Sequence, residues 1–307
     1  MEWWPGFRRW RHRRRNAWLD ASDPGLFRFG FLAHPSSAPP DGDDVWKTLD
    51  GSWRTTRLGP LTIRFHPETE MALHRTADGS EIAIIGRLIF ATPQLAPPAI
   101  ADLAADAPAA LRNATGRFAV IVCKGGAVSV FHDAFGARSI FYRGDPRAPA
   151  FASHSGLLAH AYGIPLAEAP LRIVASREYT KQVVRTLPGD LTMFEDVFAL
   201  IPNNMLEFPT RRTRRYWPAS PREPTDFEAF FREIDALYAA AIADGRRRGL
   251  SPLFGITGGI DSRAIYSAWL NAGVPFRGVT WSRPLKEKEL PIIDAILRRT
   301  SIPHVHH

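Results

Sequence analysis

The sequence predicts an α+β domain of stacked antiparallel sheets, followed by the start of an α/β domain with a doubly wound parallel sheet. Short segments of alternating apolar and polar residues, separated by Gly and Asp, fill residues 61–208 and favour antiparallel sheets. Five prolines between residues 202 and 224 then mark a linker. Beyond it the apolar period changes from 2 to 3.6, and apolar strands alternate with helices.

The composition is that of a globular protein. Of the 307 residues, 45% are hydrophobic and 23% are charged, which excludes a largely disordered chain and predicts about two domains. The sequence contains no run of 18 apolar residues, so no membrane span is predicted. A secretory signal is not predicted either, because no apolar stretch follows the basic N-terminus. Cys123 is the single cysteine, which excludes an internal disulfide and a CxxC zinc site. A reducing, cytoplasmic setting is expected.

The net charge of +8 is concentrated at the N-terminus, where residues 1–20 hold six arginines interleaved with aromatic side chains. Residues 3–18 could bind nucleic acid or an anionic membrane surface through this combination. They could equally be the tail of a larger fold, with the tryptophans packing on it. The second interpretation is favoured because no downstream segment resembles a nucleic-acid-binding module.

Residues 21–217 form the predicted first domain. Residues 34–44 are rich in Pro, Ser and Asp and are predicted to be a loop, whereas the Ala-rich residues 99–111 predict a helix. The predicted strands lie at residues 61–65, 71–73, 82–85, 118–122, 128–131, 140–142, 191–194 and 204–208.

Residues 218–307 form the predicted second domain, which starts with an amphipathic helix. Thr225 and Glu228 form a capping box at its start, and the basic run Arg246–Arg248 suits its C-terminus. Its predicted apolar face consists of Phe227, Phe230, Phe231, Ile234, Leu237, Tyr238, Ala241 and Ile242.

The rest of this domain predicts a βαβαβ arrangement. A strand at residues 253–256 is followed by a glycine turn and a helix, and the inward-facing side chains of that helix are predicted to be Ala264, Ile265, Ala268 and Trp269. A second strand over about 276–281, a helix over about 286–299 and a third strand from Ile302 follow.

The turn between the first of these strands and its helix carries the candidate chemistry. Gly258 and Gly259 let backbone N–H groups approach an anion closely, and the helix N-terminus adds its positive dipole. The hydroxyls of Thr257 and Ser262 can donate to phosphate oxygens. The carboxylate of Asp261 suits Mg²⁺ held against that phosphate. The turn is not a common P-loop, because no lysine follows it.

Thr257–Ser262 resembles the SGGxDS pyrophosphate loop of ATP pyrophosphatases, with Thr257 in place of the first serine. The tail Ile302–His307 resembles the segment that follows the next helix in asparagine synthetases. The loop alone would also fit NAD synthetases, GMP synthetases and tRNA-modifying enzymes.

The first half of the chain distinguishes among these families. Five segments, in order, resemble motifs of the asparagine synthetase-like family: Gly116–Ala119, His132–Tyr142, Phe151–Leu158, Thr192–Pro202 and Arg215–Trp217. The resemblance implies a first domain with the four-layer αββα, Ntn-hydrolase-like fold of class II glutamine amidotransferases. It implies a second domain of the adenine nucleotide alpha hydrolase-like type.

Two departures from the family pattern concern glutamine hydrolysis. The family uses an N-terminal cysteine as nucleophile, whereas Glu2 follows the initiator methionine here and Cys123 is predicted to be a buried structural residue. Gly86–Phe90 stands where the family has GEIYN, so the asparagine that polarises the substrate carbonyl is also missing. We therefore expect a degenerate amidotransferase domain without glutaminase activity, and no catalytic residue is assigned.

A third departure is length, since the chain stops after the third predicted strand and looks truncated or fragmentary against the family. A sheet cut there would leave an open edge, so self-association into a homo-oligomer is expected. His304, His306 and His307 could suggest a metal site, but the family strand already accounts for them.

The resemblance implies an AMP-forming carbon–nitrogen ligase with ATP and Mg²⁺. A small-molecule or peptide carboxylate would be activated as an acyl-adenylate with release of pyrophosphate, and an amine donor would then form the amide. Adenine would lie against Val279, Thr280, Trp281 and Ser282, where parallel sheets bind ligands. Arg263 could reach a phosphate or could be solvated. The alternative is a non-catalytic homologue that acts as a binding or scaffold protein.

Overall fold

The computed structural model describes residues 27–40, 52–91, 97–182, 184–218, 220–221, 225–281 and 289–306. The chain divides into two compact units: the first extends to Arg222, and the second covers Glu223–His307, with residues 89–95 and 113–115 grouped with the second. Residues 3–18, Ser282 and His307, which carry some of the expectations above, lie outside the described residues.

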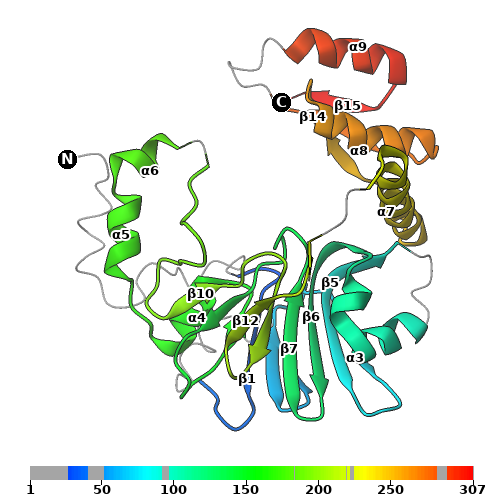
Figure 1. Ribbon diagram of the computed structural model, residues 1–307. Helices are drawn as coiled ribbons and strands as arrows, with labels where there is room; N and C mark the ends of the chain where they lie inside the picture. The colour runs from blue at the N-terminus through cyan, green and yellow to red at the C-terminus, as the bar shows by residue number, and fades with distance from the viewer. Residues whose placement is uncertain are drawn as a thin grey trace. The chain divides into compact units, whose positions relative to one another are not determined.

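Two six-stranded sheets form the first unit (Figure 1). One sheet contains β1 (Phe31–Pro35), β2 (Arg54–Leu58), β3 (Leu61–Phe65), β8 (Phe141–Arg143), β9 (Phe151–Ala152) and β10 (Val197–Ala199). The other contains β4 (Met71–Arg75), β5 (Glu81–Phe90), β6 (Ala114–Lys124), β7 (Ala127–His132), β11 (Asn204–Phe208) and β12 (Arg212–Arg215). The strand orders are β10-β8-β9-β1-β3-β2 and β12-β11-β7-β6-β5-β4. The pairs that β1, β7, β8 and β11 form are antiparallel, as predicted.

Alternation of side chains along the strands places an apolar core between the two sheets. In β1, Phe31 and Ala33 belong to this core, whereas Leu32 belongs to a second cluster on the other side of the strand. In β6, Ile121 and Cys123 face the same core from the opposite sheet. The sheet that contains β1 therefore carries apolar side chains on both faces: one face packs on the other sheet, and the other face belongs to the second cluster.

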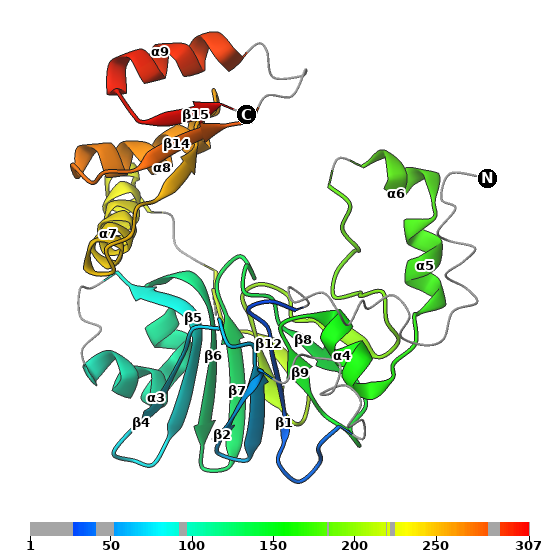
Figure 2. The same cartoon turned by 180° about the vertical axis from the view of Figure 1, so that it is seen from behind.

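Helices cover the two outer faces of this sandwich. In Figures 1 and 2, α3 (Pro97–Leu111) lies against the sheet that contains β5 and β6, and Lys124 of β6 donates to the Ala104 carbonyl of α3 at 2.9 Å. On the other sheet, Leu157 and Leu158 of α4 (Ser155–Tyr162) pack in the cluster of Leu32. The layers are thus αββα. Two short helices, α5 (Glu168–Val174) and α6 (Arg177–Lys181), follow.

Five strands of this unit are not predicted by the sequence: β1, β2, β9, β10 and β12. β1 contains His34 and Pro35, so the predicted loop over 34–44 is wrong at its start. β2 lies within residues that resemble no family motif, and β12 lies among the prolines that suggested a linker. Both β2 and β12 contain arginines and few buried side chains, so an apolar pattern does not reveal them.

The predicted strand at 191–194 is wrong. Leu191 and Phe194 form only isolated bridges, and the strand of this region is β10. Thr192 explains the difference, because its hydroxyl donates to the Val197 carbonyl at 2.7 Å and accepts from the Phe194 N–H at 3.2 Å. These local side-chain bonds hold the segment in a turn instead of a ladder.

The second unit contains three parallel strands with connecting helices, as predicted. Its elements are α7 (Phe227–Arg247), β13 (Leu253–Gly255), α8 (Ile260–Asn271), β14 (Arg277–Thr280), α9 (Leu290–Thr300) and β15 (His304–His306). The strand order is β13-β14-β15, and both pairs are parallel. One apolar cluster joins all three helices to the sheet, with Ile242 from α7, Trp269 from α8 and Ile293 from α9.

The predicted capping box of α7 is wrong, because Asp226 caps the helix instead of Thr225. The Asp226 carboxylate accepts a hydrogen bond of 2.7 Å from the Ala229 N–H. Asp226 directly precedes the first helical residue, which places its carboxylate within reach of the third N–H of the helix. The predicted C-terminus is confirmed, since Arg246 and Arg247 lie in the last turn and Arg248 is the C-cap.

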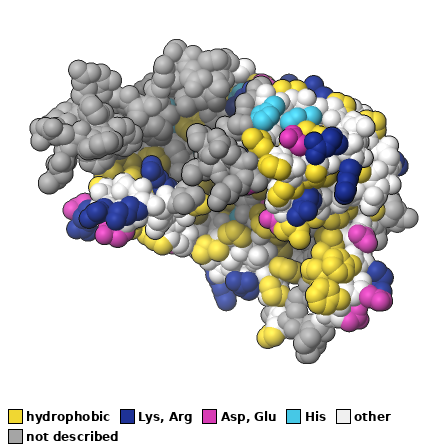
Figure 3. Space-filling view, turned by 90° about the horizontal axis from the view of Figure 1, so that it is seen from above, with side chains coloured by type: hydrophobic (Ala, Val, Ile, Leu, Met, Phe, Trp, Pro, Cys, Tyr) yellow, Lys and Arg dark blue, Asp and Glu magenta, His cyan; other side chains and the backbone are white. Residues whose placement is uncertain are grey.

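The predicted apolar face of α7 is only half buried. Ile242 is buried, but Phe227, Phe230 and Phe231 are exposed and contact one another in a row of rings. The helix has 21 residues and α8 has 12, so α8 can cover only part of α7. Hydrophobic side chains also lie among Lys and Arg side chains on the face drawn in Figure 3. No helix in the described ranges is both long and apolar enough to cross a membrane.

The predicted inner face of α8 is wrong in two of its four positions. Trp269 is buried, but Ala264 and Ile265 are exposed, and Tyr266 is buried in their place. The rings of Trp269 and Tyr266 pack against Phe254 and Phe276 respectively, with centroids 5.2 Å and 6.3 Å apart. The larger aromatic surface therefore decides the orientation of the helix.

We expect Asp226→Ala to lower the free energy of unfolding of the second unit by about 1 kcal/mol, because the first turn of α7 loses its cap. Thr225→Ala should change it little, since Thr225 is outside the helix. Urea unfolding followed by circular dichroism measures both variants. Equal losses in the two variants would contradict the assignment of Asp226 as the cap.

Candidate functional site

The candidate phosphate loop lies at the carboxyl end of β13. Thr257, Gly258 and Gly259 connect the strand to α8, whose first turn contains Asp261 and Ser262. β14 ends at the same edge of the sheet, because the two strands are parallel, with Gly255 opposite Val279. Ligands bind open parallel sheets at such carboxyl edges.

Hydroxyl groups hold the two ends of this loop together. Thr257 Oγ1 and Ser262 Oγ lie 2.7 Å apart. The Gly259 N–H donates to Thr257 Oγ1 at 3.2 Å, and the Ser262 hydroxyl donates to the Gly259 carbonyl at 3.2 Å. Arg263 also donates from Nε to the Gly259 carbonyl, at 3.2 Å, so its guanidinium lies beside the loop. The loop is therefore closed by its own side chains.

The loop also binds a carboxylate that the sequence analysis missed. The Gly258 N–H donates to Glu289 Oε2 at 3.0 Å, and Glu289 immediately precedes α9. A Cβ atom at position 258 would lie only 3.2 Å from Glu289 Cγ and 3.4 Å from Ile292 Cδ1. The start of α9 thus packs on this glycine, and nothing local in the sequence signals a contact across 31 residues.

Asp261 is the one loop residue suited to a metal ion. Its carboxylate is exposed in the first turn of α8, and Gly259 caps that helix without a side-chain hydrogen bond. Among the described residues, no group of three or more His, Cys, Asp or Glu side chains could hold a metal ion. Asp261 fits the partial ligand set that Mg²⁺ uses with phosphates, in which water and phosphate oxygens supply the other ligands.

The predicted adenine-side residues lie at the end of β14 beside the loop. Thr280 donates to the Ile256 carbonyl at 2.7 Å, next to Thr257, and its Oγ1 lies 2.9 Å from His304 Nε2. The single hydroxyl proton of Thr280 goes to the carbonyl, so His304 Nε2 must donate its own proton to Thr280. Val279 is buried, and Trp281 is 60% exposed.

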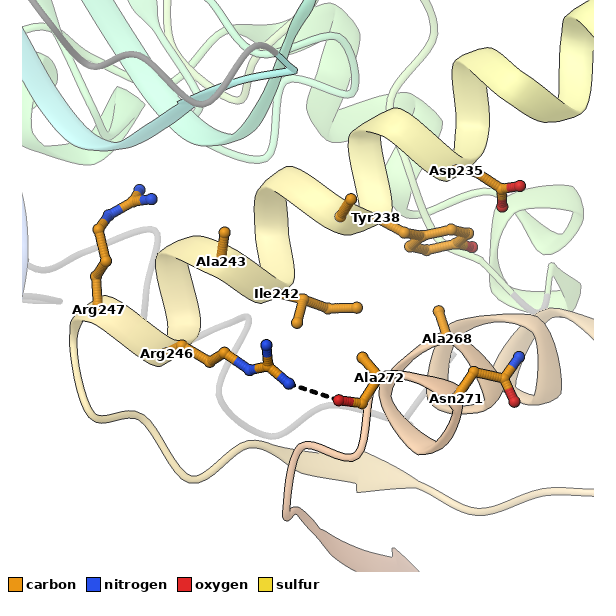
Figure 4. Close-up of a pocket in the computed structure, with 10 residues that line it drawn as sticks. Asp235, Tyr238, Ile242, Ala243, Arg246, Arg247, Ala268, Asn271 and Ala272 are labelled. Carbon is orange, nitrogen blue, oxygen red and sulfur yellow. Dashed lines mark hydrogen bonds between the residues drawn. The ribbon is translucent and has the colours of Figure 1, made fainter.

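A groove of about 570 Å³ lies between α7 and the far end of α8 (Figure 4). Arg246 donates to the Ala272 carbonyl across it, and Tyr238 and Ile242 form part of its wall. Arg247 and Arg248 both pair with the buried Asp244. Arg246 thus joins α7 to α8, whereas Arg247 and Arg248 pair within the last turn of α7, in agreement with the predicted place of the basic run at the helix C-terminus. The groove lies at the end of α8 remote from the loop.

The first unit contains one thiol, and its surroundings make it unreactive. Cys123 is buried in the core of the sandwich, and its Sγ lies 3.5 Å from the Leu58 carbonyl. Burial raises the pKa of the Cys123 thiol to about 12, with a further contribution from Glu81. Since the thiolate is the nucleophile, the prediction of a buried structural cysteine is confirmed.

The start of β1, the first described strand of the sandwich, is held by hydrogen bonds to the side chains of Ser153 and Arg138. The Phe31 N–H donates to Ser153 Oγ at 2.9 Å, and His154 Nδ1 lies 2.8 Å from the same oxygen. Arg138 donates to the Phe29 carbonyl at 2.6 Å. The residues at this position, Phe29, Gly30 and Phe31, include no nucleophilic side chain.

Gly86–Phe90, which departs from the family pattern, forms the second half of β5. Gly86 has φ of +86°, and a Cβ there would lie 2.5 Å from the Arg117 carbonyl. The glycine is thus required by close approach of the neighbouring strand. Arg87 follows it, with no side-chain amide to polarise a carbonyl.

Comparisons with solved structures find distant likenesses. Glutamine phosphoribosylpyrophosphate (PRPP) amidotransferase from B. subtilis, complexed with ADP and GMP, aligns with 90% of this chain and 59% of its own, at 12% identity and a TM-score of 0.36. A structure described as the allosteric regulatory enzyme of purine biosynthesis aligns with 90% of this chain and 74% of its own, at 10% identity and a TM-score of 0.35. No protein-family model and no curated protein matches the sequence.

This chain thus spans less than two thirds of the length of the PRPP amidotransferase. At TM-scores below 0.5, neither likeness carries an argument about fold or activity. The αββα layering described above rests on the strand order and packing of the first unit itself. The asparagine synthetase-like assignment and nucleotide binding by the second unit remain proposals.

We expect the stability of the first unit to depend on the protonation of His154. Burial, with the nearby Arg138 and Arg117, lowers its pKa from 6.5 to about 4. The unfolded chain therefore binds this proton first as the pH falls, so the free energy of unfolding decreases between about pH 6.5 and pH 4. His154→Gln should show a weaker decrease in urea titrations over this range. Parallel curves for the two proteins would contradict this assignment.

Proposed function

We propose that this chain is an asparagine synthetase-like ligase that binds ATP, activates a carboxylate as an acyl-adenylate and forms an amide with an amine that it does not obtain from glutamine. The observation that carries the proposal is the loop Thr257–Ser262 between β13 and α8. Its backbone already donates to one carboxylate, that of Glu289, which supports an affinity of the loop for oxyanions.

In this proposal the loop binds the β- and γ-phosphates of ATP. The N-cap of α8 is Gly259, which has no side chain to accept from the N–H groups of the first turn. These N–H groups can therefore donate to phosphate oxygens, and the helix dipole favours the negative charge there. The hydroxyls of Thr257 and Ser262 would add donors once their protons turn from the bond between them and from the Gly259 carbonyl to the phosphate. As pyrophosphate leaves, negative charge develops on the same oxygens, and the loop stabilises it without rearranging.

Asp261 would hold Mg²⁺ against the phosphates, and the metal ion would supply further stabilisation of the leaving pyrophosphate. The exposed carboxylate at the second position of α8 can reach a ligand above the helix N-terminus. Arg263, held at the Gly259 carbonyl, could pair with the same phosphates.

The adenine would lie along the end of β14. Thr280 ties this strand to Ile256, so the strand end and the loop are held at a fixed separation. Trp281, exposed beside them, offers a ring face for stacking. The carboxylate substrate would attack the α-phosphate between these two elements and release pyrophosphate. The amine donor would then attack the acyl carbon of the adenylate, form the amide and release AMP.

The first unit supports an amine source other than glutamine. Its thiol is buried with a raised pKa, and none of the residues Phe29, Gly30 and Phe31 at the start of β1 carries a nucleophilic side chain. This observation favours a ligase that receives its amine from a substrate over one that hydrolyses glutamine.

Asp261→Asn should weaken the binding of Mg-ATP by tenfold or more, roughly 1.4 kcal/mol, because the metal loses a charged ligand. Asp294→Asn removes an equal charge from the exposed side of α9 and should leave the affinity unchanged. Isothermal titration calorimetry measures both. Equal affinities in the parent and the Asp261 variant would contradict the assignment of Asp261 as a magnesium ligand.

Glutamine should yield no glutamate above the uncatalysed rate, with or without Mg-ATP. The reason is that the single cysteine of the sequence, Cys123, is buried. A coupled glutamate dehydrogenase assay on the parent and on Cys123→Ala makes the comparison. Turnover that disappears in the Cys123 variant would overturn the proposal for the first unit.

A further inference from the structure

The contact between Glu289 and the phosphate loop has a second consequence. Glu289 is half-buried at the start of α9, and its Oε2 lies 3.0 Å from the Gly258 nitrogen. The loop and α9 are separated in the sequence by α8 and β14, and the folded sheet brings them together. A negatively charged oxygen thus already stands against the loop that is proposed to bind phosphate.

The two glycine N–H groups of the loop each donate to a side chain in the free protein. The Gly258 N–H is engaged by the Glu289 carboxylate, and the Gly259 N–H by the Thr257 hydroxyl. The helix that follows begins without a side-chain cap. A hydroxyl can accept and donate, so Thr257 can stay in place beside a phosphate. A carboxylate can only accept and repels phosphate oxygens.

Packing fixes the backbone of α9 at this contact. Glu289 Cβ and Cγ would lie 3.3 Å and 3.2 Å from a Cβ at position 258, and Ile292 packs on the same glycine. The side chain must therefore rotate away from the loop, or its charge must stay beside the bound phosphate. Both outcomes oppose anion binding.

We propose that Glu289 is an internal competitor for the phosphate loop: its carboxylate takes the Gly258 N–H in the free protein, and an incoming phosphate chain must displace it. This inference rests on the proposed function, since it concerns the same loop. It makes Glu289 a residue that sets which anions the loop accepts. A weakly charged anion leaves the Glu289 contact intact, whereas a polyphosphate carries enough charge to replace it.

Glu289→Gln tests the proposal, because the amide oxygen keeps a hydrogen bond to Gly258 while the charge is removed. The probe is inorganic pyrophosphate with magnesium, titrated by calorimetry. The variant should bind about tenfold more tightly than the parent or better. Asp294→Asn, which removes one charge from the exposed side of the same helix, should bind like the parent.

The outcomes separate the two proposals. If the parent binds pyrophosphate and Glu289→Gln binds with equal or lower affinity, the competitor role is overturned while the phosphate site stands. Binding by the variant but not by the parent supports both. If neither protein binds pyrophosphate, both the phosphate site and the competitor role are overturned.

A second measurement uses the unaltered protein and does not depend on the folding of a variant. In protein labelled with ¹⁵N-glycine, saturating pyrophosphate should shift the Gly258 amide resonance, because its acceptor changes from carboxylate to phosphate. The Gly163 amide, at the C-cap of α4 in the first unit, is an internal control and should not move. An unmoved Gly258 amide in protein saturated with pyrophosphate would overturn the proposal.

Discussion

The parallel pairing of β13 with β14 is the constraint on which the candidate site depends. It aligns the carboxyl ends of the two strands, so that the turn after β13 and the residues after β14 lie at one edge. The Thr280 hydroxyl then reaches the Ile256 carbonyl and fixes their separation. The apolar cluster around Trp269 and Phe276 holds α8 against the sheet, which aims the first turn of that helix at the same edge. The shape of the loop follows from these elements, because β13 and α8 fix the positions of its two ends.

The sequence was sufficient to predict those features of the site that depend on residues adjacent in the chain. The Gly-Gly turn, its hydroxyls and the strand-to-helix order around it follow from local propensity, and the structure contains them. Glu289 could not be predicted, because its contact with Gly258 depends on how α9 packs on the sheet. The orientation of α8 was mispredicted for a related reason: Tyr266 and Ile265 are both apolar, and only the rings of Phe254 and Phe276 decide between them. β2 was missed because a short edge strand with two arginines lacks a clear alternating pattern. β1 was missed for another reason: it lies inside the sheet with consecutive buried residues, and it ends in His34 and Pro35, which were assigned to a loop.

The first unit has the stability features of a sandwich but lacks reactive groups where the resemblance would require them. Its core is continuous from Phe31 to Cys123 across both sheets. At the start of β1, Ser153 accepts a hydrogen bond from the Phe31 N–H, and Arg138 donates one to the Phe29 carbonyl. Side chains that could serve chemistry instead hold the chain in place.

α8 is secured at both ends by residues that belong to other helices. Arg246 of α7 donates to the Ala272 carbonyl at its C-terminal end, and Glu289 lies against the glycine turn at its N-terminal end. A cation and an anion thus stand at the poles of the helix that favour them. The 12 residues of α8 span about 18 Å, so these two contacts join α7 and the start of α9 to opposite ends of one helix.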